Sequence, residues 1–188
     1  MRRPSLGALN GLVLAGGHSS RMGRDKGTII VHGIPQREYL FQELTQVCTE
    51  VYTSCRHDQQ LPSSLHPIGD AFDIGSPLNG ILSAFRLSPH TAWLAVAVDM
   101  PNINRNVFKL LASHRDPVKP ATCFYNDETK LPEPLLTIWE PAAYPSLLKF
   151  VETGRKSPRD FLAINDVNIL HTKDTSIFYN MNTPDDVL

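Results

Sequence analysis

The stretch best suited to chemistry is the loop expected between Gly16 and Lys26, which is rich in glycine, serine and charge. It follows a short apolar run, residues 12–15, that is typical of a buried parallel strand. Gly16 and Gly17 would let backbone N–H groups approach a polyphosphate, and Arg21 and Lys26 would add positive charge. The spacing matches neither a Walker A loop nor the Gly-x-Gly-x-x-Gly dinucleotide fingerprint. Glycines alone would favour an ordinary turn, but glycines combined with these cations favour phosphate binding.

A single carboxylate, Asp99, ends the most apolar segment of the chain. Residues 92–98 form a continuous apolar run, which predicts a central strand covered on both faces. Open α/β sheets bind ligands outside the carboxyl ends of their strands, so Asp99 should face the same edge as the glycine loop. There it could hold a hard divalent cation against phosphate oxygens. The alternative is a turn or N-cap Asp before Pro101, and the nearby glycine loop makes the metal site the better interpretation.

Alternating strands and helices are expected to position these residues. Strands are expected at residues 12–15, 51–55, 92–98, 121–125, 135–139, 167–170 and 176–179, and helices over 37–49 and around 81–85, 107–111 and 144–151. The proline-rich stretch 130–134 reads as a loop. The pattern predicts one α/β domain over residues 1–188, with a mostly parallel sheet and helices on both faces. A last helix is expected after Thr183, and the sequence leaves open whether Leu188 belongs to a longer polypeptide.

Composition argues against several classes of protein. Lys and Arg total 18 against 19 Asp and Glu, without the basic excess of a nucleic-acid binder. The 3 cysteines are widely spaced, which favours free thiols in a reducing compartment over disulfides or a zinc site. No apolar run approaches the roughly 20 residues needed to cross a bilayer. We therefore expect a cytoplasmic monomer that binds neither nucleic acid nor membrane, although the sequence does not determine the oligomeric state.

Residues 14–26 resemble the Leu-Ala-Gly-Gly-x-Ser-x-Arg-Met-Gly-x-Asp-Lys signature of the molybdenum cofactor guanylyltransferases, the MobA family. Further similarities follow in the family's order. They are Gly75-Ser76-Pro77-Leu78-Asn79-Gly80 (Gly-Pro-Leu-Ala-Gly in the family), Val98-Asp99-Met100-Pro101 (Asp-x-Pro), Pro134-Leu135, and residues 180–186 (Asn-x-Asn-Thr-Pro-Glu-Asp/Glu). The resemblance thus spans the chain.

The resemblance implies a three-layer Rossmann-like nucleotidyltransferase fold and transfer of GMP from GTP to the terminal phosphate of molybdopterin or its molybdenum-loaded form. Asp99 matches the family's Mg²⁺ ligand, and Arg21 and Lys26 would hold the triphosphate. The residues expected to frame the nucleotide are Leu14, Ala15, Gly16, Gly17, Asp70, Pro77, Leu78 and Gly80. Carbonyl groups of residues 78–80 are expected to accept hydrogen bonds from guanine, and backbone N–H groups near Gly16 to donate to its O6 atom.

The acceptor is expected to meet residues near the end of the chain. Asn180 and Asn182 would share a face in an extended segment, and the family places this pair near metal and acceptor. Arg155 and Lys156 lie in a basic loop, residues 154–159, that suits an anionic acceptor such as a pterin phosphate. A solvated basic turn that completes a helix is an equally good interpretation of this loop. Transient contact with other molybdenum cofactor proteins is a further expectation.

Two departures from the family's pattern leave alternatives open. Thr53 stands where the family often has an Asn near the end of the second strand, and Asn79 replaces an Ala. One alternative is a cytidylyltransferase on the same cofactor, or a nucleotidyltransferase with another phosphorylated acceptor. A different class, a non-catalytic nucleotide-binding module, is disfavoured because Arg21, Lys26 and Asp99 are all present.

Overall fold

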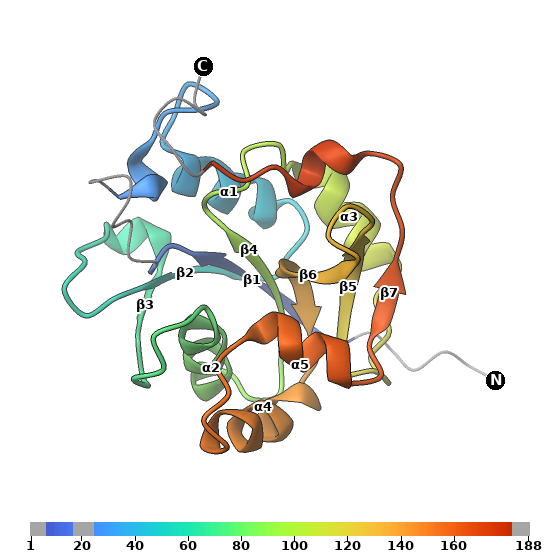
Figure 1. Cartoon of the computed structure of the whole chain (residues 1–188). Helices are drawn as coiled ribbons and strands as arrows, with labels where there is room; N and C mark the ends of the chain where they lie inside the picture. The colour runs from blue at the N-terminus through green and yellow to red at the C-terminus, as the bar shows by residue number, and fades with distance from the viewer. Residues whose placement is uncertain (1–6, 17–24, 182–188) are drawn as a thin grey trace.

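A seven-stranded mixed sheet forms the centre of the computed structural model (Figure 1), which describes residues 7–16 and 25–181. The strands are β1 (Leu9–Leu14), β2 (Val51–Cys55), β3 (Pro67–Gly69), β4 (Ala92–Ala97), β5 (Ala121–Asn126), β6 (Leu131–Trp139) and β7 (Asn168–Leu170). They lie in the order β3-β2-β1-β4-β6-β5-β7, with β6 antiparallel to β4 and β5 and the other pairs parallel. The expected mostly parallel sheet is confirmed.

Helices cover both faces of this sheet. They are α1 (Gln36–Thr45), α2 (Leu78–Leu87), α3 (Arg105–Ser113), α4 (Ala143–Glu152) and α5 (Pro158–Ile164). Figure 1 shows α1 and α3 on one face and α2, α4 and α5 on the other. This arrangement confirms the expected three-layer α/β fold. Among the described residues, no helix combines the length and apolarity that crossing a bilayer requires.

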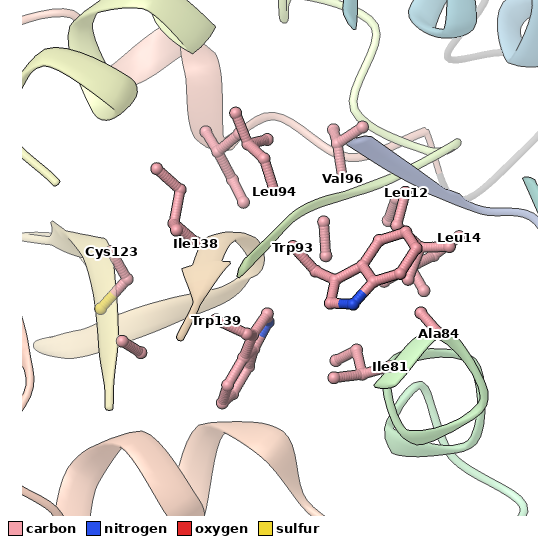
Figure 2. Packing of buried hydrophobic residues seen from close by; sticks show 14 of the residues in the cluster. Leu12, Leu14, Ile81, Ala84, Trp93, Leu94, Val96, Cys123, Ile138 and Trp139 are labelled. Atoms are coloured by element: carbon pink, nitrogen blue, oxygen red, sulfur yellow. The ribbon is translucent and has the colours of Figure 1, made fainter. Parts of the chain in front are cut away.

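The core is built on the two central strands and on β6. Every residue of β1 and of β4 is buried, as continuous apolar runs predict. Trp93 of β4 pairs in register with Trp139 of β6, so both indoles project from the same face of the sheet. Figure 2 shows them beside Ile81 and Ala84 of α2. The large buried surface of the two rings anchors α2 against the strands that carry the site.

Two local expectations were wrong. Residues 175–178 form the 3-10 helix η3 (Thr175–Phe178) in place of a strand, because the Asp174 side chain caps it by accepting from the Ser176 N–H. The proline-rich stretch expected as a loop belongs to β6. Pro132 and Pro134 are tolerated there because β6 has register partners on β4 only from residue 136 onward.

Candidate active site

The carboxyl ends of the parallel strands β1, β2 and β4 meet at one edge of the sheet and border a cleft of about 510 Å³. Ligands of open α/β sheets bind at such an edge. The predicted site residues that line the cleft are Leu14, Ala15, Gly16, Lys26, Asp70, Pro77, Gly80 and Asp99. The topology therefore gathers most of the described part of the predicted nucleotide site in one place. Gly17, Arg21 and Asn182 lie outside the described residues, and their roles stay predictions.

Lys26 and Asp99 face one another across this cleft. The Lys26 Nζ atom lies 3.3 Å from Asp99 Oδ2, and both side chains are partly buried. Asp99 Oδ1 is buried and has no hydrogen-bond partner among the described residues. A buried carboxylate oxygen without a partner is unusual, and it is a natural ligand for a hard cation.

The surroundings of Asp99 allow a cation to take substrate oxygens as its other ligands. In residues 7–16 and 25–181, no group of three or more His, Cys, Asp or Glu side chains could hold a metal by itself. Mg²⁺ in particular is usually held by one or two carboxylates, substrate phosphates and water. The chemistry of Asp99 therefore fits a metal that binds together with a phosphorylated substrate.

A second, shallower hollow of about 670 Å³ lies beside the cleft. It shares Arg56, Asp70, Asp73 and Asn79 with the cleft, and Phe72 contributes an aromatic side chain to its wall. The Asp70 N–H donates to Cys55 O (3.0 Å), which fixes this segment to the end of β2. A carboxylate and an aromatic ring at one hollow can bind a planar polar ring such as a nucleobase.

Asn79, one of the departures from the family's pattern, holds the wall of this hollow in place. Its Oδ1 atom accepts from the Phe72 N–H (3.1 Å). Ser83 Oγ accepts from the Ala71 N–H (2.8 Å) and donates to Asn79 O (2.7 Å). The Asn79 amide therefore fixes residue 72 against α2, and Ser83 fixes residue 71, which gives Asn79 a structural role.

Thr53, the other departure from the family's pattern, does not bring its side chain to the cleft. Thr53 is fully buried, whereas the neighbouring Ser54 lines the cleft. Successive side chains of a strand point to opposite faces, so one position along β2 changes which hydroxyl can meet a ligand.

The start of α2 also differs from expectation. The Leu78 side chain is fully buried in the core, and α2 begins at this residue. Carbonyl groups in a first helical turn accept hydrogen bonds within the helix, so it is N–H groups that a helix start offers to ligands. Carbonyls of residues 78–80 are therefore unsuited to accept hydrogen bonds from guanine.

The residues predicted for the acceptor fall into two groups. Asn180 is half-buried and donates to Phe178 O (3.2 Å), and the next residue, Met181, donates its N–H to Asp99 O (2.8 Å). The chain on this side is thus tied directly to Asp99. Arg155 and Lys156 are exposed, and neither lines the cleft. The Arg155 guanidinium lies over the Phe150 ring, 4.6 Å from its centroid, which favours the basic-turn interpretation for this loop.

Arg56 and Glu133 are among the charged residues at or near the cleft that were not predicted as site residues from the sequence. Arg56 lines the cleft, and its Nη1 atom donates to Gly16 O (3.4 Å). Glu133 is buried, accepts from the Leu135 N–H (2.9 Å) and lies 3.6 Å from an Arg159 nitrogen. Burial raises the pKa of the Glu133 carboxyl, and the nearby charge of Asp99 adds to the rise, whereas the Leu135 N–H and Arg159 oppose it. No spacing in the sequence marks either residue.

Comparison with known proteins gives a consistent family. A family model described as a MobA-like NTP transferase domain matches residues 11–171. A molybdenum cofactor biosynthesis bifunctional protein of Synechocystis sp. is 34% identical over 182 residues, which cover 95% of this chain and 52% of that protein. The chain thus spans about half the length of this relative. A probable molybdenum cofactor guanylyltransferase of Nostoc sp. is 29% identical over 184 residues, covering 95% and 88% of the two chains.

Solved structures share the fold. Molybdopterin-guanine dinucleotide biosynthesis protein A from Archaeoglobus fulgidus superposes with a TM-score of 0.75 at 24% identity, covering 95% of this chain and 94% of that one. The 2-C-methyl-D-erythritol 4-phosphate cytidylyltransferase from Thermus thermophilus superposes with a TM-score of 0.65 at 12% identity, covering 94% of each chain.

The close approach of α2 to the strand ends gives a first prediction. A Cβ atom at Gly80 would lie 2.7 Å from Ser54 Oγ and 3.0 Å from Leu14 Cδ2. Alanine in a helix is otherwise favoured over glycine by about 0.5–1 kcal/mol. A net loss of stability in Gly80→Ala would therefore report the steric clash of the new Cβ atom. We expect Gly80→Ala to lower the free energy of unfolding by about 1–2 kcal/mol in urea denaturation.

Gly69→Ala is the matched control, because a Cβ atom there meets nothing within 4 Å. It should change the free energy of unfolding by less than about 0.5 kcal/mol. If Gly80→Ala were as stable as the native chain, α2 would not be packed this closely on the cleft.

Proposed function

Because the chain belongs to the MobA-like NTP transferase family and is a nucleotidyltransferase, we propose that it transfers GMP from GTP to the terminal phosphate of molybdopterin or its molybdenum-loaded form. The observation that carries this proposal is the pairing of Lys26 with Asp99, whose second oxygen is buried and unpartnered within the described residues. Relatives named as molybdenum cofactor guanylyltransferases support the choice of nucleotide and acceptor.

The reaction needs little from the protein beyond position and charge. An oxygen of the acceptor phosphate attacks the α-phosphorus of GTP in line, and the bond from that phosphorus to the leaving pyrophosphate breaks. The attacking oxygen is already anionic, so no strong general base is required. Catalysis then consists of holding the reactants in line and neutralising the charge that develops.

Charges at the cleft support a metal-bound form of the triphosphate. Among the described residues that line the cleft, the anionic ones are Asp25, Asp70, Asp73 and Asp99, and the cationic ones are Lys26 and Arg56. These described side chains together carry a net negative charge, which favours a triphosphate that arrives with a counter-ion. Asp99 is the residue placed to hold Mg²⁺, which would neutralise phosphate oxygens when bound.

Lys26 is assigned to the triphosphate, and the segment after Phe178 is assigned to the acceptor. Lys26 would hold triphosphate oxygens and the charge that develops on them, together with Arg21. The acceptor phosphate would approach beside Asn180 and Asn182, because the Met181 N–H ties this segment to Asp99. Arg155 and Lys156 are given no part in this proposal, because neither side chain lines the cleft.

Asp99 provides the direct test of the metal site. We expect Asp99→Asn to lower turnover by at least about a hundredfold, because the neutral amide removes the charge that holds the cation. Binding of Mn²⁺ in the presence of GTP, followed by electron paramagnetic resonance, should weaken in parallel. The melting temperature should change little, and Asp166→Asn, at an exposed position, should leave turnover unaltered. Near-normal turnover of Asp99→Asn at saturating Mg²⁺ would contradict the assignment.

Base selection provides the second test. Guanine presents N1–H and N2–H₂ as donors, and the two oxygens of Asp70 can accept both. Each lost partner is worth about 1–3 kcal/mol, so competitive titration should show GTP bound well ahead of ATP, CTP and UTP. Asp70→Asn should narrow this preference by weakening GTP binding alone. Equal or tighter binding of CTP would overturn the guanylyltransferase assignment and favour a cytidylyltransferase.

A further inference from the structure

The carboxylate of Asp25 is held by groups from three separate segments. Its Oδ1 atom accepts from the Gly27 N–H (2.9 Å), and its Oδ2 atom accepts from Gln59 Nε2 (2.7 Å). Arg37 Nη1 lies 3.0 Å from the same Oδ2 atom, as an ion pair without hydrogen-bond alignment, and the Arg37 side chain is only 8% exposed. We call Asp25, Arg37 and Gln59 the Asp25 cluster.

The Asp25 cluster controls the direction in which Lys26 leaves the backbone. Asp25 is the N-cap of the 3-10 helix η1 (Lys26–Thr28), and Lys26 is the first residue of that helix. Beneath the helix, a Cβ atom at Gly27 would lie 3.2 Å from Arg37 Cβ and Nε and from Asp25 Oδ1. Arg37 therefore packs directly against η1. With the cap and the base of the helix fixed, the Lys26 side chain enters the cleft beside Asp99.

Gln59 uses both ends of its amide in this arrangement. While its Nε2 atom donates to Asp25, its Oε1 atom accepts from the Arg56 N–H (3.4 Å). Arg56 in turn donates to Gly16 O. Residues 56–59, which follow β2, thus contact the two described residues that border positions 17–24, namely Gly16 and Asp25. The segment after β2 therefore contacts a described residue on each side of positions 17–24.

We propose that Arg37 and Gln59 are positioning residues that act on Lys26 through Asp25. This inference rests on the proposed function for the role of Lys26 in phosphate binding. Neither Arg37 nor Gln59 lines the cleft, so neither is expected to touch the substrate. Their effect is to keep η1 in the orientation that places the Lys26 ammonium group beside the phosphate oxygens.

The test is a double-mutant cycle with Gln59→Glu and Lys26→Ala. Gln59→Glu replaces the donor with a second carboxylate at the 2.7 Å contact, so repulsion from Asp25 should turn η1. Residues in one hydrogen-bond network commonly show coupling energies of this size, so we expect Gln59→Glu to weaken binding of Mg²⁺–tripolyphosphate by about three- to tenfold. In the Lys26→Ala background, Gln59→Glu should cause no further loss. The double variant Gln59→Glu with Asp25→Asn, which exchanges donor and acceptor, should recover part of the binding.

A matched control is available in the Glu43–Arg105 pair, which joins α1 to the start of α3 away from the cleft. The Glu43 carboxylate accepts from Arg105 N (2.7 Å) and Nη2 (2.9 Å). Glu43→Gln should lower the melting temperature without changing tripolyphosphate binding. Arg37→Met should behave like Gln59→Glu in the cycle, and its melting temperature shows whether the chain is still folded.

Two results would overturn the positioning role. One is unchanged tripolyphosphate binding by the Gln59→Glu variant. The other is an equally large loss of tripolyphosphate binding when Gln59→Glu is added to the Lys26→Ala variant. Tripolyphosphate carries neither guanine nor an acceptor, so this cycle reports on Lys26 even if the chain proves unable to transfer GMP. Failure of the proposed function is read separately, from the absence of transfer by the native chain.

Discussion

The site depends on the parallel pairing of two buried strands, β1 and β4, which end side by side. β1 and β4 pair from Leu9↔Ala92 to Leu14↔Ala97, and the loops that leave their ends carry Lys26 and Asp99. These two side chains lie 3.3 Å apart although 73 positions separate them in the chain. A one-residue slip in register would turn every side chain of a strand to the other face of the sheet. The apolar pattern that fills the core therefore also fixes the two charges that face the cleft.

The site depends on placed charges, since the chain as a whole carries a formal net charge of −1. Acidic side chains outnumber cations among the described residues at the cleft, and buried Glu133 adds another carboxyl beside Asp99. Among the described residues, this charge balance favours an anion that arrives with its own cation. Neighbouring contacts shape the site: Asp25 caps the start of η1, where Lys26 lies, and Gly80 lets α2 approach the strand ends. The fold contributes rigid geometry, and the bound substrate and metal would complete the charge balance.

The strands around the site could be predicted because long apolar runs have few alternatives. The run ending at Asp99 and the glycines after β1 were sufficient to predict the edge of the sheet at which the cleft lies. The start of β6 could not be predicted, because its prolines indicate a loop until the neighbouring strands are known. The helix η3 could not be predicted, because the Asp174 cap outweighs the apolar pattern of residues 176–179. The sequence did not single out Ser54 as the cleft residue of β2, because this strand is buried along almost its whole length and shows no alternation. Arg56, Glu133 and the Asp25 cluster depend on contacts between distant segments, which spacing along the chain does not reveal.

We propose that this cleft joins a nucleoside monophosphate to a phosphorylated pterin. The most direct measurement is pyrophosphate release by the purified chain with Mg²⁺ and each of the four nucleoside triphosphates, in the presence and absence of molybdopterin. The proposed GMP transfer requires release with GTP only when molybdopterin is present, in step with formation of a guanine dinucleotide. An absence of release with every triphosphate, or release with GTP that does not depend on the pterin, would contradict it.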